Sequence, residues 1–420
     1  MSTDPALLDD LLWRGLIAHS TDLDEMREAL TRESVRFYVG FDPTAPSLHI
    51  GNLVQIVTAR RLQRAGHTPY ALVGGATGMI GDPRDSGERS LNDLDTVKDW
   101  VQRVRRQIEP FLEFEGSNAA TMVDNYDWTA SLSTIDFLRD VGKHFPVNRM
   151  LARDVVRTRL EAGISYTEFS YVLLQSMDFL NLFRDHGVRM QFGGSDQWGN
   201  LTGGVELIRR SVGGHAHAFA TPLITKTDGS KYGKTEGGAL WLDPTMMSPY
   251  AFHQFWLNVE DGSVGELLRI FTFLTRAEIE DLEHQTMEKP FLRAGQKTLA
   301  DAVTTLVHGE DETKAAKTAA AALFGGGDLR ELGEQSLTAA LAEAGAATAA
   351  RGTSYVDLLV ESGLVQSKGE ARRAIGEGGA YLNNERVTDT DLVPGDEHLL
   401  PGGWLVLRRG KKRLAGIHIR

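Results

Sequence analysis

Short apolar segments alternate with amphipathic helical segments through the first half of the chain, which indicates a doubly wound, mostly parallel α/β sheet of the Rossmann-like kind. The expected strands are 35–41, 70–73, 120–123 and 188–192, and the expected helices are 51–65 and 95–109. Each strand runs into a polar or glycine-rich cluster. Because ligands of such sheets bind at the carboxyl ends of the strands, we expect a site at that edge.

Composition restricts the class of protein. The 420 residues exceed one ordinary core, and 41% hydrophobic with 24% charged residues is typical of a globular protein. A net charge of −12 argues against coating nucleic acid without specificity. The absence of cysteine excludes a disulfide scaffold, a Cys-ligated metal and a Cys nucleophile. The acidic start without an apolar segment, and the lack of a membrane-length apolar stretch, predict a cytoplasmic location.

The second half of the chain changes character. Residues 248–321 have helical patterns, and an Ala/Gly-rich stretch over 318–350 is typical of a linker with some helix. Residues 353–420 form a small unit in which we expect helices at 355–362 and 368–376 and strands at 380–382 and 404–408. Its basic side chains fall into two clusters: Lys368, Arg372 and Arg373, and then Arg408, Arg409, Lys411 and Lys412. Such clusters can contact phosphate, although a solvated tail has the same composition.

The loop over 42–52 connects the first strand to the first helix. Free N–H groups at a helix start attract phosphate, and His49 can donate to a phosphate oxygen. Gly51 would let a nucleotide approach the backbone. Taken alone, such a segment is more often a proline-rich turn with a surface histidine.

Two other loops carry charged groups. Lys231 and Lys234 flank a glycine and could neutralise a developing pyrophosphate, although such a loop is more often simply solvated. Asp196 follows a strand and the double glycine 193–194, where an acid can bind ribose hydroxyls or merely cap a helix.

One expected helix carries a narrow polar face. At about 100° per residue, Tyr171, Gln175 and Asp178 lie on one side of an otherwise apolar helix. This face is either exposed to solvent or lines a site. The glycine-rich segment 74–83 matches neither phosphate-binding fingerprint, and it is better interpreted as a tight turn that presents Asp82.

Together these segments resemble the class I aminoacyl-tRNA synthetases, specifically the bacterial tyrosyl-tRNA synthetase family, over essentially the whole chain. HIGN at 49–52 is similar to the HIGH signature with Asn52 in its last position, and KYGKT at 231–235 is similar to KMSKS. The segments YVGFDPTAPSLHIGN, GGATGMIGDP, SYVLLQSMDF and QFGGSDQWGN resemble the family's own motifs. The resemblance implies a catalytic domain over 1–225 with a dimer insertion at about 130–165, a signature loop and α-helical domain over 226–325, a linker over 326–352 and an S4-like RNA-binding domain over 353–420.

The resemblance also implies the roles of individual residues. Tyr38 and Asp178 would hold the hydroxyl of tyrosine, Asp82, Tyr171 and Gln175 its ammonium, and Gln197 would lie near its carboxylate. Thr44 and His49 would hold the γ-phosphate of ATP, and Lys231 and Lys234 would close over the pyrophosphate. The remaining nucleotide contacts would come from Gly40, Asp42, Gly51, Asn52, Gly194 and Asp196.

The implied reaction attaches L-tyrosine to tRNA(Tyr) through a tyrosyl-adenylate, with Mg-ATP as substrate, no protein-ligated metal, and a homodimer as the working form. One rival is a tryptophanyl-tRNA synthetase, against which Tyr38 and Asp178 argue because they suit a phenol. A metabolite nucleotidyltransferase would not need the basic C-terminal unit. A catalytically silent RNA-binding protein would not need His49, Lys231 and Lys234.

Overall fold

The computed structural model describes residues 3–83, 87, 91–225, 239–324, 327–410 and 413–420. The chain divides into two compact units, Met1–Met246 with Gly265–Asp281 and Met247–Val264 with Leu282–Arg420.

The first unit is built on a six-stranded sheet with the order β1-β6-β5-β2-β3-β4, in which only β1 is antiparallel to its neighbour. Its strands are β1 (His19–Ser20), β2 (Arg36–Phe41), β3 (Thr68–Val73), β4 (Thr121–Asp124), β5 (Met190–Gly194) and β6 (His217–Thr221). The predicted parallel α/β sheet is therefore confirmed. The non-sequential order places a reversal between β2 and β5, which is where ligands of such sheets bind.

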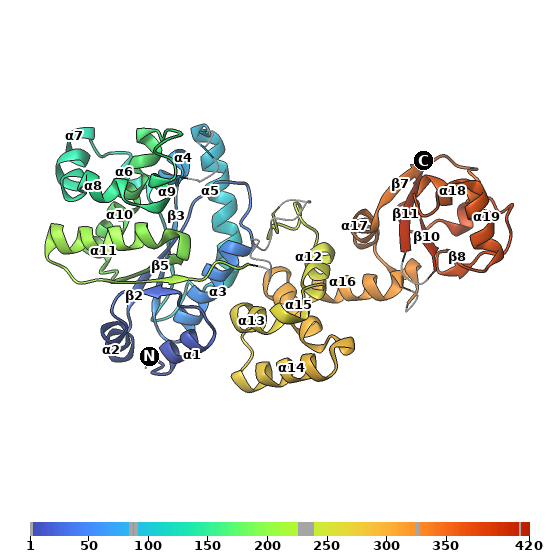
Figure 1. The fold of residues 1–420 in the computed structure, drawn as a ribbon, viewed down its shortest axis with the longest axis horizontal. Helices are drawn as coiled ribbons and strands as arrows, with labels where there is room; N and C mark the ends of the chain where they lie inside the picture. The colour runs from blue at the N-terminus through green and yellow to red at the C-terminus, as the bar shows by residue number, and fades with distance from the viewer. Residues whose placement is uncertain (1–2, 84–86, 88–90, 226–238, 325–326, 411–412) are drawn as a thin grey trace. The chain divides into compact units, whose positions relative to one another are not determined.

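Helices cover both faces of this sheet. Figure 1 shows α10 and α11 on one side of the strands and α3 and α5 on the other. The helices in the described part of Met1–Met246 are α1 (Leu7–Trp13), α2 (Leu23–Arg32), α3 (Ile50–Arg64), α4 (Thr77–Ile80), α5 (Leu94–Ile108), α6 (Tyr126–Thr129), α7 (Thr134–Asp136), α8 (Val147–Leu151), α9 (Asp154–Arg157), α10 (Tyr166–His186) and α11 (Trp198–Val212). Short 3-10 or π turns cover Glu109–Phe111, Phe137–Val141, Gly142–His144 and Ser195–Gln197.

The helical region predicted after residue 248 is present. It contains α12 (Pro249–Leu257), α13 (Asp261–Phe271), α14 (Arg276–Glu288), α15 (Ala294–His308) and α16 (Glu310–Leu323). A 3-10 turn at Pro290–Leu292 separates α14 from α15.

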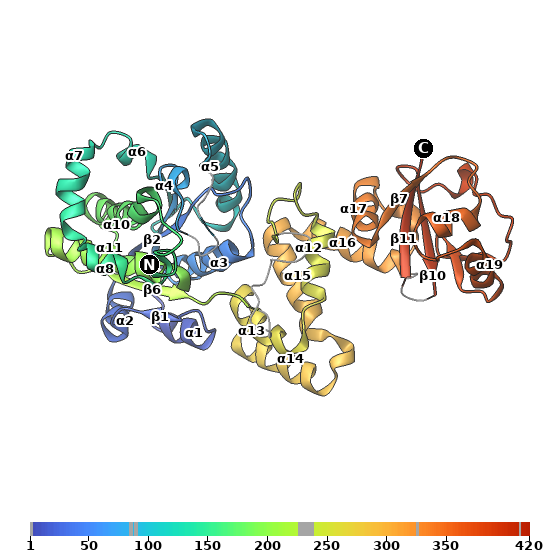
Figure 2. The same ribbon diagram turned by 45° about the horizontal axis from the view of Figure 1, so that its top comes forward.

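The C-terminal region contains a five-stranded sheet with the order β7-β11-β10-β8-β9. Figure 2 shows its strands β7, β11 and β10 together with the helices α18 and α19. Its elements are β7 (Ala346–Ala349), α18 (Tyr355–Glu361), α19 (Lys368–Gly376), β8 (Ala380–Leu382), β9 (Glu385–Arg386), β10 (Trp404–Arg409) and β11 (Arg413–Ile419), with a 3-10 turn at Asp396–His398. The two helices and two strands predicted here are confirmed.

The predicted linker over 326–352 is not a linker in its described part. It contains a 3-10 turn at Leu329–Glu331, α17 (Glu334–Ala344) and β7, which pairs in parallel with β11. Leu337, Ala340 and Leu341 are fully buried, and they pack in one cluster with Trp404 of the sheet. Their spacing of three and four residues is a helical apolar face, which the Ala/Gly-rich composition concealed. The segment is therefore part of the C-terminal fold.

Candidate active site

Polar side chains gather at the carboxyl ends of β2, β3, β4 and β5, as expected for a parallel sheet. Asp178 of α10 lies at the centre of this group of polar side chains and is 2% exposed. Its carboxylate accepts hydrogen bonds from Nδ2 of Asn125 at 3.0 Å and from Nε1 of Trp128 at 2.8 Å. Burial raises the pKa of the Asp178 carboxyl to about 7, and the two donors limit this rise.

Tyr38 of β2 lies beside this carboxylate and is 1% exposed. Burial raises the pKa of its hydroxyl well above its usual value, and the negative charges of Asp178 and Asp42 act in the same direction. The side chain of Gln175 acts in the opposite direction and lowers this pKa. Oε1 of Gln175 is buried and has no hydrogen-bond partner among the described residues, so it can accept a hydrogen bond from a ligand.

The helix predicted to carry Tyr171, Gln175 and Asp178 is α10, and its polar face points into the site rather than into solvent. The hydroxyl of Tyr171 donates to Oδ2 of Asp42 at 2.5 Å. Oδ1 of Asp42 accepts from Oγ1 of Thr77 at 2.6 Å. Asp42 was predicted as part of the ATP loop. Its carboxylate connects that loop to Tyr171, which was predicted to bind the substrate tyrosine. A Cβ atom at Gly74 would lie 2.1 Å from this carboxylate, so glycine is required there.

A second carboxylate, Asp82, lies in a separate polar group. It accepts from Nε2 of Gln197 at 2.7 Å and from Nδ2 of Asn200 at 3.3 Å. Burial raises the pKa of Asp82, while these two donors and the positive charge of Arg153 lower it. A carboxylate held in this way can bind a cation.

The loop with the HIGN motif starts α3. His49 is the N-cap of this helix, and its Nδ1 accepts from the N–H of Gly51 at 3.1 Å. Oδ1 of Asn52 accepts from the N–H of His49 at 3.0 Å, which completes a capping box. A ribose hydroxyl would therefore have to meet Nδ2 of Asn52. Thr44 and His49 are exposed, as a phosphate contact requires.

Gly194 is the last residue of β5, and Asp196 follows it in a 3-10 turn. Gly40 lies on the neighbouring strand β2. A Cβ atom at Gly194 would lie 2.6 Å from Oδ1 of Asp196, so a side chain there would displace the acid. Gly40 is exposed, which leaves the strand open to a ligand. Lys231, Lys234, Lys411 and Lys412 lie outside the described residues.

The basic residues of the C-terminal unit differ in their surroundings. Lys368 pairs with Asp357 at 2.6 Å, and Arg409 pairs with Glu370 at 2.7 Å. Arg408 stacks on the ring of Tyr381 at 4.1 Å. Arg372 and Arg373 are exposed on α19, and neither makes an ion pair within the described part of the chain.

Sequence reasoning missed Thr77, Asn125, Trp128, Arg153 and Asn200. Asn125 had a signal, because the polar pair 124–125 ends a strand at the expected edge. Thr77 and Asn200 had one as well, because both lie in segments that resemble family motifs. Trp128 and Arg153 had none, because each meets its partner through a contact distant in the chain.

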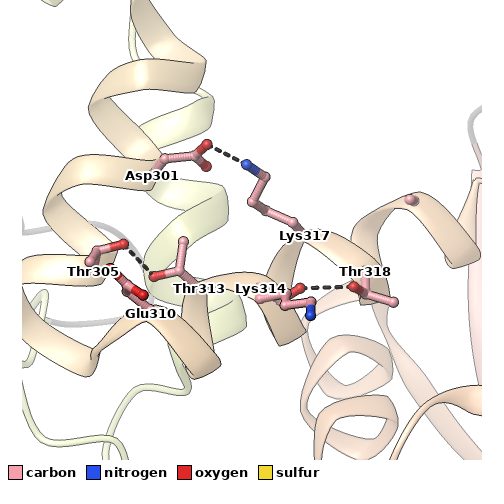
Figure 3. Close-up of a pocket in the computed structure, with 8 residues that line it drawn as sticks. Asp301, Thr305, Glu310, Thr313, Lys314, Lys317 and Thr318 are labelled. Atoms are coloured by element: carbon pink, nitrogen blue, oxygen red, sulfur yellow. Dashed lines mark hydrogen bonds and ion pairs between the residues drawn. The ribbon is translucent and has the colours of Figure 1, made fainter.

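One pocket of about 580 Å³ is lined by residues of α15 and α16, none of which belongs to a motif (Figure 3). Its polar groups are largely paired with each other: Lys317 with Asp301 at 2.5 Å, and Thr305 with Thr313 at 3.0 Å. We assign no ligand to it.

Comparison with known proteins identifies the family. The family described as "tRNA synthetases class I (W and Y)" matches residues 30–325. The chain is 60% identical to the tyrosine--tRNA ligase of Streptomyces coelicolor, over 98% of this chain and 99% of that one. The chain belongs to the class I tRNA synthetases. The resemblance to the tyrosine enzymes is thereby confirmed.

Further comparisons agree with this. A domain described as "Tyrosine--tRNA ligase SYY-like C-terminal domain" matches residues 337–416 of the synthetase. The Kineococcus radiotolerans tyrosine--tRNA ligase is 58% identical over 98% of each chain. A truncated mitochondrial tyrosyl-tRNA synthetase from Coccidioides posadasii has a TM-score of 0.66 at 30% identity, covering 74% of this synthetase and 90% of that chain.

No helix in the described part of the synthetase is long and apolar enough to cross a membrane.

Proposed function

We propose that this synthetase attaches L-tyrosine to tRNA(Tyr) in two steps, with Mg-ATP as substrate, in the cytoplasm. The observation that carries the choice of amino acid is the buried Asp178 carboxylate beside the Tyr38 hydroxyl. An ionised carboxylate accepts a hydrogen bond from a phenol, and a buried acceptor strongly disfavours a side chain that cannot donate.

The rest of the tyrosine molecule would meet groups of the required charge. Its ammonium would contact Asp82, Tyr171 and Gln175, and the unpaired Oε1 of Gln175 supports this placement. Gln197 donates to Asp82, which is proposed to bind the ammonium of the substrate. Gln197 is therefore close enough to reach the carboxylate on the same carbon atom of the substrate.

In the first step the tyrosine carboxylate attacks the α-phosphate of ATP and pyrophosphate leaves. In the second a terminal ribose hydroxyl of the tRNA attacks the adenylate carbonyl and AMP leaves. No side chain acts as nucleophile, so catalysis consists of positioning and charge stabilisation. Thr44, His49, Lys231 and Lys234 would supply the groups around the phosphates, and Gly40, Asp42, Gly51, Asn52, Gly194 and Asp196 would surround the nucleoside.

The direct test is ATP–pyrophosphate exchange with single amino acids. We expect exchange with tyrosine and none above background with tryptophan. Exchange driven by tryptophan would overturn the assignment, because the catalytic motifs alone are common to both kinds of enzyme.

The pKa of Asp178 predicts a pH dependence. Tyrosine selects the ionised carboxylate, so its affinity should level off well above pH 7 and fall as the carboxyl protonates with a pKa of about 7, by up to about tenfold per pH unit on the acid side. KM for tyrosine, measured by exchange between pH 5.5 and 8.5, should show this rise on the acid side. The Asp178→Asn variant should lose the component with a midpoint near 7. A profile that is the same in both proteins would contradict the role.

The C-terminal unit is proposed to bind tRNA. The double change of Arg372→Gln and Arg373→Gln should raise KM for tRNA and reduce the slope of log affinity against log salt by about 1 per lost phosphate contact. Pyrophosphate exchange should stay unchanged. Arg351→Gln, which removes an exposed arginine paired with Asp396, is the control. Unchanged charging by the double variant at physiological salt would contradict the role. Point changes are preferable to truncation near residue 350, because that cut would separate β7 from β11.

The insertion at about 130–165 is proposed to form the dimer interface. Its short helices expose apolar side chains, among them Ile135 at 69% and Val147 at 60%. Changing both to aspartate should convert a dimer to a monomer, measured by sedimentation equilibrium. Phe291→Asp alters a side chain that is 79% exposed outside the insertion and should leave the mass unchanged. A double variant that stays dimeric would move the interface elsewhere.

A further inference from the structure

Three side chains that the tyrosine chemistry does not use converge at one place in the first unit. Glu25, His215 and His217 each offer one donor atom, and the three atoms lie within 4.8 Å of one another. Nε2 of His215 is 3.0 Å from Oε2 of Glu25. The two imidazole rings are 4.9 Å apart between centroids and meet edge to face. A surface ion pair would account for Glu25 and His215 but not for His217.

The local structure explains why these residues meet. His215 and His217 are two residues apart in a chain that enters β6, so their side chains lie on the same side of it. On the neighbouring side β1 pairs with β6, and the N–H of Thr21 donates to the carbonyl of Ala218 at 2.8 Å. The chain then turns into α2, where Asp22 caps the N–H groups of Asp24 and Glu25. This cap holds the first turn of α2, and with it Glu25, beside the start of β6.

His217 is the residue that indicates a ligand. It is 3% exposed, its ring meets that of His215 edge to face, and one of its nitrogens lies within 4.8 Å of the donor atoms of Glu25 and His215. Glu25 and His215 are more than half exposed in their side chains, so both can move towards an ion while His217 stays in place.

We propose that Glu25, His215 and His217 bind a divalent transition metal, with Zn²⁺ as the best match. Two imidazole nitrogens and one carboxylate oxygen are a common zinc ligand set, and water would complete a tetrahedron. Ligands at about 2.0–2.2 Å from zinc lie closer to one another than 4.8 Å, so the two exposed side chains would close on the ion. The nearby Arg189 is paired with Glu33 at 2.6 Å, which reduces its opposition to a cation.

The metal would have a structural role. His217 begins β6, whereas the reacting groups lie at the carboxyl ends of the strands, where Thr221 ends β6 and accepts from Gln55 at 2.6 Å. A bound ion would tie α2 to β6 and stabilise the native state. This site revises the expectation that the protein ligates no metal.

The test uses the untagged full-length chain, stripped with a chelator and titrated with ZnCl₂ by calorimetry. We expect one tight site per chain and an increase of Tm that grows with zinc concentration. His215→Ala and Glu25→Gln should each weaken zinc binding by at least about tenfold. Both should retain tyrosine-dependent pyrophosphate exchange, because neither residue lies among the groups assigned to tyrosine or ATP.

His284→Ala is the matched control. His284 and Glu288 form a similar exposed pair, with 3.4 Å between Nε2 and Oε1, and no third ligand among the described residues. This variant should bind zinc like the unchanged protein. Equal zinc affinity in the unchanged protein and His215→Ala would overturn the proposal and leave Glu25 and His215 as an ion pair only. Loss of the tight site in His284→Ala would overturn it as well.

Discussion

Replacing Asp178 with asparagine is expected to lower kcat/KM for tyrosine by about 10- to 150-fold in pyrophosphate exchange. A hydrogen bond to a charged acceptor contributes about 1.5–3 kcal/mol, which corresponds to that range. The buried carboxylate would be lost, and the new amide would turn an N–H towards Asn125, Trp128 or the substrate, all of which are donors. Exchange with phenylalanine should change much less, because phenylalanine has no hydroxyl to donate. The ratio of kcat/KM for tyrosine to that for phenylalanine should therefore narrow.

Asp185→Asn provides the control for this change. Asp185 lies on the same helix, α10, and is exposed, so the same chemical substitution there should leave both rates unchanged. Tyr38→Phe should narrow the preference for tyrosine in the same direction. A tyrosine-to-phenylalanine ratio that stays at the unaltered value in Asp178→Asn would show that another group recognises the hydroxyl.

Replacing Lys234 with alanine is expected to slow adenylate formation by about 10²-fold or more while KM for tyrosine stays nearly constant. The prediction rests on the KYGKT motif. The lysine is proposed to meet charge that grows on the pyrophosphate only towards the transition state, and such an interaction affects kcat and not ground-state binding. The measurement is the pre-steady-state rate of tyrosyl-adenylate formation. Lys98→Ala, which alters an exposed lysine of α5, should leave that rate unchanged. A normal burst in Lys234→Ala would remove the lysine from the mechanism.

The sequence predicted local elements well where periodicity was strong. The helix that carries Tyr171 and Asp178 was recognised because its polar residues recur at helical spacing, and α10 has that face. The segment over 334–349 was misinterpreted, because alanine and glycine are frequent in linkers and also suit a helix packed closely against a sheet. Its buried Leu337 and Leu341 were the available signal.

Membership of the class I tRNA synthetases, the parallel sheet and the edge that carries the site were determined by the sequence alone, since they depend on local pattern and on motif order. Only the tertiary structure decided which groups meet there. Trp128 reaches Asp178 across 50 residues, and Tyr171 reaches Asp42 across 129. Glu25 and His217 come together in the same way, through the pairing of β1 with β6. Periodicity reports which face of an element is buried, but the partner of a buried polar group depends on how distant elements pack, and no local spacing contains that information.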